Sequence, residues 1–399
     1  MNKRALAVII AGFFTVFTAF GVRYVYGILL PEMLPALAIS KTQAGVIFSS
    51  FLITYTVFSP ILGVMTDRYD VRIILSLFVV FLGAGALLMS FATTVLNASL
   101  FFSIAGFGHA ACWVPVVTLI QRWVPDNRRG VALAFTDLGS ASGIAVWSLV
   151  MPSIVAHYTW RAGWMSLGLS AFLVAGMNFF LVRSQPEERK GAQSETATPL
   201  LREPVRVTYK KVFHDRNFWL LGVSYFFLGS SIIIPFTFLS TYAVTELRWS
   251  YETASRLIAV IAVAGMFGKL LLGHLSDILG RVRIMMVCGV LVASGCLGIA
   301  RSADLLTIGA FTALFGLGYG AIWPVYAAAV RDFFQKESAG SVMGLWTFFL
   351  GIGTTLSPVL SGWTIDRMGT YMTAFMLAFA GGVISLLLLL PIALSPDRR

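Results

Sequence analysis

The chain of 399 residues is poor in charge, because Asp, Glu, Lys and Arg together make up only 12% of it. An ordinary soluble domain carries about twice that share, so this composition argues against a soluble globular protein. There are only three cysteines, Cys112, Cys288 and Cys296, and all lie in apolar stretches without metal-ligand spacing. We expect them to be packing residues.

Sequence signals for an enzyme are also missing. The chain has no phosphate-binding Gly-x-x-x-x-Gly-Lys-Ser/Thr loop, so ATP is not the expected energy source. It shows no nucleophile paired with a base and no cluster of metal-ligand residues. The sequence therefore predicts a protein that is not an enzyme and that needs no cofactor and no metal.

Apolar residues are plentiful instead: they make up 58% of the chain, and the mean hydropathy is +0.84. Stretches of eighteen or more mostly apolar residues cross a bilayer as helices, since a helix satisfies its own backbone in lipid. Twelve such stretches predict an all-α integral membrane protein with twelve transmembrane helices. They cover roughly residues 5–31, 43–63, 73–94, 96–121, 130–156, 162–182, 217–245, 253–274, 284–301, 304–330, 339–364 and 371–394.

The chain contains an internal repeat at a constant offset of 210 residues. Residues 63–75 read GVMTDRYDVRIIL, and residues 273–286 read GHLSDILGRVRIMM. The same offset relates further pairs: Ser40 and Ser250, Gly106 and Gly316, Gly108 and Gly318, Trp113 and Trp323, and Gly130 and Gly340. A gap-free repeat over this length predicts two equivalent halves.

One polar segment, residues 183–216, separates these halves. We expect an N-terminal six-helix bundle over 1–182, a flexible linker over 183–216 and a C-terminal six-helix bundle over 217–399. Within the linker, 205–216 is expected to form a short basic amphipathic helix on the membrane surface.

The formal net charge of +11 could suggest a nucleic-acid partner, but the distribution of the basic residues argues otherwise. The expected loops on the side of the two termini hold 21 of the 29 Lys and Arg residues, and the other side holds 6. This asymmetry predicts cytoplasmic termini. We expect a multi-pass protein of the cell (inner) membrane, in contact with the lipid bilayer and monomeric, with no nucleic-acid partner.

The repeated Gly-x-x-x-Asp loop resembles the signature loop of the major facilitator superfamily. This resemblance covers the whole chain and implies the major facilitator fold, in which such charged residues lock the two bundles together on the cytoplasmic side. It assigns a gating role to Asp67, Arg68, Arg72, Asp277 and Arg281. Alternatively, these charges only mark cytoplasmic loop ends. The first copy departs from the family, which usually has Gly where this chain has Asp70.

A narrower resemblance is carried by three segments: RWVPDNRRGVALAFTDLG at 122–139, GVRYVYG at 21–27 and GKLLLG at 268–273. They are similar to the oxalate/formate antiporters and the monocarboxylate transporters. The resemblance implies transport of a small organic anion and places Lys269 where those families have a substrate-binding Arg. Two departures stand out: Gly265 replaces the Asp of the monocarboxylate transporters, and 339–364 lack the Lys of the oxalate antiporters.

Charges inside a membrane are costly and indicate function by default. Arg23 and Lys269 lie within apolar segments and could hold a carboxylate, with Tyr26 one turn from Arg23. Alternatively, either cation extends to the nearer membrane surface.

Further candidates are aromatic or titratable. Trp113, Trp323 and Tyr326 would line a substrate site or serve as ordinary packing residues. His109 and Asp137 are candidates for proton coupling. His109 could instead be a packing residue, and Asp137 could balance a cavity cation or pair with an Arg near 122–129.

These observations predict a secondary active transporter that moves a small organic anion, a mono- or dicarboxylate, by alternating access. Its expected partners are this anion and, for symport, protons; anion exchange is the other coupling mode. A carrier that exports lipophilic drugs and a transport-inactive ligand sensor of the same fold are the alternatives.

Overall fold

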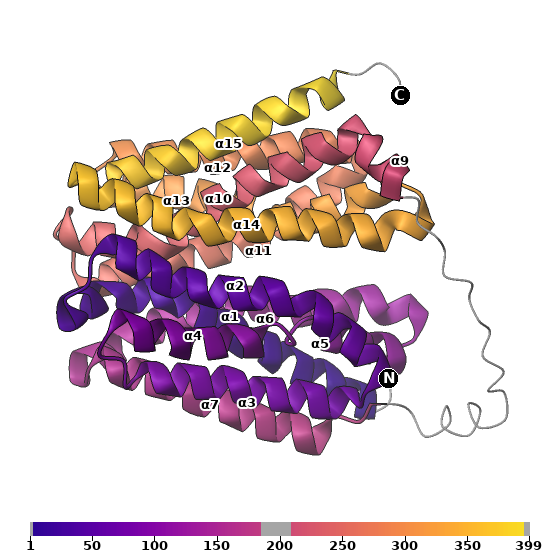
Figure 1. Cartoon of the computed structure of the whole chain (residues 1–399), viewed down its shortest axis with the longest axis horizontal. Coiled ribbons are helices and arrows are strands. Elements are labelled where there is room, and N and C mark those ends of the chain that lie inside the picture. The colour runs from indigo at the N-terminus through magenta and orange to yellow at the C-terminus, as the bar shows by residue number, and fades with distance from the viewer. Residues whose placement is uncertain (1–2, 185–208, 395–399) are drawn as a thin grey trace.

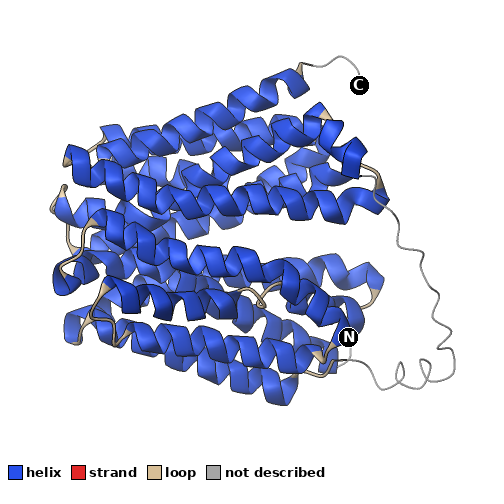
Figure 2. Cartoon of the chain, viewed as in Figure 1, coloured by secondary structure: helices blue, strands red, loops and turns tan. Residues whose placement is uncertain are grey.

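A computed structural model describes residues 3–184 and 209–394, which consist of helices joined by short loops, without strands (Figure 2). The N-terminal half contains α1 (Lys3–Leu37), α2 (Lys41–Arg68), α3 (Val71–Met89), α4 (Val95–His109), α5 (Val114–Trp123), α6 (Asp126–His157) and α7 (Trp160–Leu181). The C-terminal half contains α9 (Tyr209–His214), α10 (Arg216–Thr245), α11 (Tyr251–Leu279), α12 (Arg281–Arg301), α13 (Leu305–Phe333), α14 (Lys336–Met368) and α15 (Met372–Ala393).

Twelve spans long and apolar enough to cross a membrane are present in the described residues. This confirms the predicted fold class. The expected linker falls mostly on 185–208, which lie outside the described residues; its last part forms α9, close to the predicted short helix.

The fourth span differs from the single helix expected over 96–121. It consists of α4 and α5, with a break at residues 110–113. Pro115 lies in the first turn of α5, where its missing N–H is tolerated, so it is compatible with a helix start at this place. Within the break the backbone turns more tightly: Cys112 N donates to His109 O at 3.0 Å.

Side chains cap the N-termini of several helices by accepting hydrogen bonds from the first backbone N–H groups. Ser40 and Gln43 form a capping box at the start of α2. Asp304 caps α13 by accepting a hydrogen bond from Thr307 N, and its bonds with Thr307 lower the pKa of the Asp304 carboxyl.

The two copies of the signature loop turn differently. Gly280 has φ +94°, a backbone conformation that glycine adopts readily. Asp70, at the equivalent position, has φ −64°, and its carboxylate accepts a hydrogen bond from Arg72 N. The first copy caps α3 with a side chain and needs no glycine, so the departure at Asp70 is a change of turn geometry.

The two halves lie against each other, with α2 beside α14 and α6 beside α11 (Figure 1). The first helix begins and the last helix ends on the same side of the molecule, which we call the termini side. A single large cluster of buried apolar residues includes side chains of both halves.

Contacts between the halves are close on the side opposite the termini. Asp366 of α14 accepts hydrogen bonds from Lys41 N at 3.1 Å and Thr42 N at 2.8 Å, at the start of α2. Ser49 donates to Thr355 O at 2.5 Å. An added Cβ on Gly27 of α1 would lie 1.9 Å from the Phe236 carbonyl oxygen of α10. These contacts hold the halves together on that side.

On the termini side, three of the predicted gating residues, Arg72, Asp277 and Arg281, contact residues of their own half. Arg281 pairs with Asp277 and lies 3.6 Å from Asp332. The Arg72 guanidinium lies 4.3 Å from the ring centroid of Phe179. Arg68 is exposed, and the side chain of Asp67 lies outside the described part of the structure. The contacts named here do not join the halves, so the gating role stays a prediction.

Candidate functional site

Three charged residues lie deep within the described helices, each at least ten residues from both helix ends. Arg23 is 14 residues from the end of α1, Asp137 is 11 residues from the start of α6, and Lys269 is 10 residues from the end of α11. At 1.5 Å per residue they lie about 15 to 21 Å inside the helices, where an ionised group needs a compensating partner or a function.

Two of these residues form an ion pair between the halves. Lys269 Nζ lies 2.5 Å from Asp137 Oδ2, and each side chain is 27% exposed. The sequence left open whether Asp137 balances a cation of the cavity or pairs with an Arg near 122–129; in the structure it pairs with Lys269 of the other half. The Lys269 side chain accordingly points toward Asp137 and not toward the membrane surface.

The third residue has no acidic partner among the described residues. Arg23 is 8% exposed, and its Nε has no hydrogen-bond partner in that part of the chain. Its guanidinium lies 5.1 Å from the ring centroid of Tyr24 and 5.3 Å from that of Tyr55 on α2. Aromatic faces attract a cation, but they do not neutralise it. Within the part of the chain that the structure describes, the positive charge of Arg23 is therefore not balanced by a carboxylate.

His109 and Tyr319 connect this arginine with its surroundings. The His109 ring lies 5.1 Å from that of Tyr55, and its Nδ1 is 3.1 Å from Ala19 O, so the residue packs beside the arginine. Tyr319 of α13 reaches the same group through Phe236, because the rings of Tyr319 and Phe236 lie 4.9 Å apart. The arginine and the ion pair thus belong to one region between the halves.

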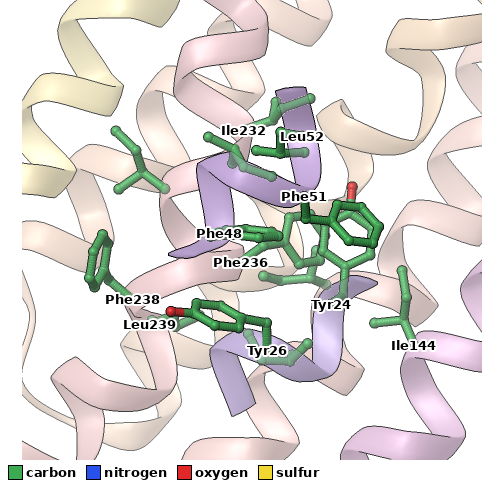
Figure 3. Packing of buried hydrophobic residues seen from close by; sticks show 14 of the residues in the cluster. Tyr24, Tyr26, Phe48, Phe51, Leu52, Ile144, Ile232, Phe236, Phe238 and Leu239 are labelled. Atoms are coloured by element: carbon green, nitrogen blue, oxygen red, sulfur yellow. The ribbon is translucent and has the colours of Figure 1, made fainter. Parts of the chain in front are cut away.

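Aromatic side chains of the two halves meet at the same place. The rings of Tyr24 and Phe236, both labelled in Figure 3, are 4.1 Å apart. The Phe236 ring also lies 4.9 Å from the ring of Tyr319. An added Cβ on Gly265, one turn before Lys269, would lie 3.3 Å from the Tyr319 ring. Because Gly265 has no side chain, the Tyr319 ring can pack closely against α11 at this position.

Two of the predicted tyrosines lie elsewhere. Tyr26 is buried between Phe48 and Phe102 and donates to Ala44 O at 2.7 Å, away from Tyr24 (Figure 3). Tyr326 is buried in the C-terminal half. The structure does not bring either tyrosine to Arg23.

The two predicted tryptophans stay candidates. Trp113 is half-buried at the break before α5. Trp323 is 39% exposed, with its ring 6.3 Å from that of Tyr225.

Tyr24, Tyr55 and Tyr319 were not predicted from the sequence. One signal could have found Tyr319, because the 210-residue offset that pairs Trp113 with Trp323 also pairs His109 with Tyr319. Tyr55 comes from a neighbouring helix, and its sequence position gives no hint of this contact.

The deep charges are not repeated between the halves. At the same offset, Arg23 corresponds to Ile233, Asp137 to Thr347 and Lys269 to Ser59. The repeat therefore provides the scaffold, and single residues of one half or the other provide the charge.

Comparison with known proteins agrees with this architecture. The family model described as Major Facilitator Superfamily matches residues 12–305 and 246–399. A hexuronate transporter of Bacillus subtilis is 26% identical, over 89% of this chain and 87% of that protein. The membrane sensor protein UhpC of Salmonella typhimurium is 25% identical, over 90% and 85%. Monocarboxylate transporter 12 of Xenopus laevis is 23% identical, over 80% and 74%.

Among solved structures, a bacterial homolog of the human lysosomal transporter Spinster, in an inward-facing and unoccupied conformation, has a TM-score of 0.77 to this chain at 15% identity. The match covers 98% of this chain and 96% of the other. At that identity the match shows the fold alone.

Proposed function

The chain belongs to the Major Facilitator Superfamily, and from this premise we propose that it is a secondary active transporter of a small organic anion. The proposed substrate is a mono- or dicarboxylate, moved by alternating access with proton symport or anion exchange. The hexuronate and monocarboxylate transporters among its relatives support an anionic substrate.

The observation that carries the proposal is the buried Arg23, which has no acidic partner among the residues that the structure describes. A guanidinium offers a planar fork of N–H donors that fits a carboxylate, and such charge-assisted bonds are strong away from water. The Nε without a partner and the flanking rings of Tyr24 and Tyr55 supply a donor and an apolar wall. A drug-export carrier would suit a neutral or acidic site, so this cation favours the anion.

The transport cycle would use the contacts between the halves. Asp366 and Ser49 hold the side opposite the termini closed, and opening that side requires their hydrogen bonds to break. Asp67, Arg68, Arg72, Asp277 and Arg281 would then approach the other half and close the termini side. In this proposal the termini side is cytoplasmic and the membrane is the cell (inner) membrane.

Proton coupling is assigned to Asp137, with His109 as the second candidate. In this proposal Asp137 exchanges a proton when its bond to Lys269 breaks during rocking of the halves. Trp113 and Trp323 would shape the apolar part of the substrate site.

A transport-inactive ligand sensor is the second candidate function, favoured by the 25% identity to a membrane sensor protein over 90% of this chain. Both functions need the same anion site. Only the transporter predicts that the bound anion crosses the membrane.

The proposal is tested with purified protein and a panel of small carboxylates in a thermal-shift assay, followed by uptake into proteoliposomes. A ligand at one hundred times its Kd stabilises the fold by about 2.7 kcal/mol. We expect one carboxylate class to stabilise the protein and to enter the liposomes, and we expect Arg23→Gln to abolish both effects.

Arg256→Gln is the matched control. It also replaces an Arg by Gln, but Arg256 lies near the start of α11, where its exposed side chain pairs with Glu252. It should behave as the native protein does. Binding without uptake would favour the sensor, and a carboxylate response unaffected by Arg23→Gln would contradict the anion site.

A further inference from the structure

We propose that Asp137 determines the charge of the substrate: by neutralising Lys269, it leaves Arg23 as the one uncompensated deep cation of the described helices and so selects monoanions over dianions. This inference rests on the proposed function and narrows it from mono- or dicarboxylates to monocarboxylates. The sequence offers Arg23 and Lys269 as cations for a carboxylate and leaves open that Asp137 balances one of them; the observed ion pair assigns Asp137 to Lys269.

The charge balance follows from the depth of the charged residues. Among the described helices, Arg23, Asp137 and Lys269 are the charged residues at least ten positions from both helix ends. Two cations and one carboxylate leave a net charge of +1. One carboxylate brings this region to neutrality, whereas a dianion leaves it with an uncompensated negative charge, which is costly away from water.

A second carboxylate would have to compete for Lys269. That amine already lies 2.5 Å from Asp137 Oδ2. A dianion that takes Lys269 leaves the Asp137 carboxylate without its cation and close to the new negative charge. Like charges at short distance oppose each other, so the ligand gains one ion pair and the protein loses another.

Apart from Arg23 and Lys269, the described helices hold no Lys or Arg at this depth. The groups packed around Arg23 are the rings of Tyr24 and Tyr55, with His109 beside Tyr55. Other cations of the described chain lie near helix ends: Arg161, for example, donates to the carbonyls of Ser90 and Ala92 at the side opposite the termini.

The test compares probes that match in shape and differ in charge. Succinamate, glutaramate and malonamate carry one negative charge at pH 7.5, and succinate, glutarate and malonate carry two. Affinity is measured for each pair, at constant pH and ionic strength, on the full-length protein in lipid nanodiscs. We expect the native protein to bind the half-amides at least tenfold more tightly than the dicarboxylates.

Asp137→Asn should free Lys269, raise the deep charge to +2 and shift the affinity ratio at least tenfold toward the dicarboxylates. The double variant Asp137→Asn/Lys269→Gln restores a net charge of +1, because it removes both members of the ion pair, and it should regain the native preference. It also keeps the test informative if the single variant does not fold. Asp126→Asn is the control, since Asp126 is exposed and pairs with Arg129.

A dicarboxylate preference in the native protein, or an Asp137→Asn ratio equal to that of Asp126→Asn, would overturn the inference while leaving the anion site intact. A distinct result, binding of both probe types that Arg23→Gln leaves unchanged, would overturn the proposed function and this inference with it.

Discussion

Gly27→Ala should force the halves apart on the side opposite the termini. An added Cβ would lie 1.9 Å from the Phe236 carbonyl oxygen and 3.0 Å from that of Thr237, both backbone atoms of the other half. Ordinary contact begins at 3.4 Å, so α1 and α10 must separate by about 1.5 Å at this point. Overpacking of this kind costs about 1 to 3 kcal/mol.

That cost falls on the conformation described here and not on one in which this side is open. A factor of ten in an equilibrium corresponds to 1.4 kcal/mol, so a cost of about 1 to 3 kcal/mol should raise the population of the open conformation about 5- to 150-fold. The probe is a cysteine at Ser49, which is 5% exposed between α2 and α14, in a background without the three native cysteines. Its alkylation rate follows the open population when opening is fast.

Gly176→Ala is the matched control, because no heavy atom lies within 4 Å of the added Cβ in α7. It should leave the alkylation of the cysteine at position 49 at the native rate. Equal rates for Gly27→Ala and Gly176→Ala would refute the reasoning, because they would show that the α1–α10 contact does not set the balance between the two conformations.

Two further predictions concern single side chains. Asp366→Ala removes the acceptor of the hydrogen bonds from the Lys41 and Thr42 amides, and loss of such a cap costs about 0.5 to 2 kcal/mol. Alkylation of the cysteine at position 49 should therefore rise about 2- to 30-fold. Asp304→Ala is the control, because its cap lies within one half, and it should leave the alkylation rate unchanged. Tyr326→Phe removes a 2.6 Å hydrogen bond to Ser224 and should lower the free energy of unfolding by about 1 kcal/mol without changing anion affinity. Weaker anion binding at native thermal stability would instead place Tyr326 in the substrate site.

The fold was predictable because its signals can be read directly from the sequence. Each long apolar segment indicates a membrane span, and the repeat at an offset of 210 residues indicates two equivalent halves. The break before α5 was missed although Pro115 is visible in the sequence, because the apolar run continues through it. Hydropathy records how long a segment is and does not record whether its helix is continuous.

The candidate site was predictable only in part. Arg23, Asp137 and Lys269 stand out because a charge in an apolar segment is rare, and the distance to the helix end gives each its depth. Depth does not show which helices touch, so the Lys269–Asp137 pair could not be distinguished from its alternatives. Spacing along one helix favoured Tyr26 beside Arg23, whereas the observed neighbours are Tyr24 and, from another helix, Tyr55.

The unrepeated charges also bear on how a ligand lies in the protein. If both halves carried the same groups, a site between them would have approximate two-fold symmetry and would accept a ligand equally well in two opposite orientations. Here Ile233, Thr347 and Ser59 occupy the positions equivalent to the three charged residues. In the proposed site, a ligand would therefore meet Arg23 without a matching cation from the equivalent position of the other half, so the two orientations of the ligand would differ in energy.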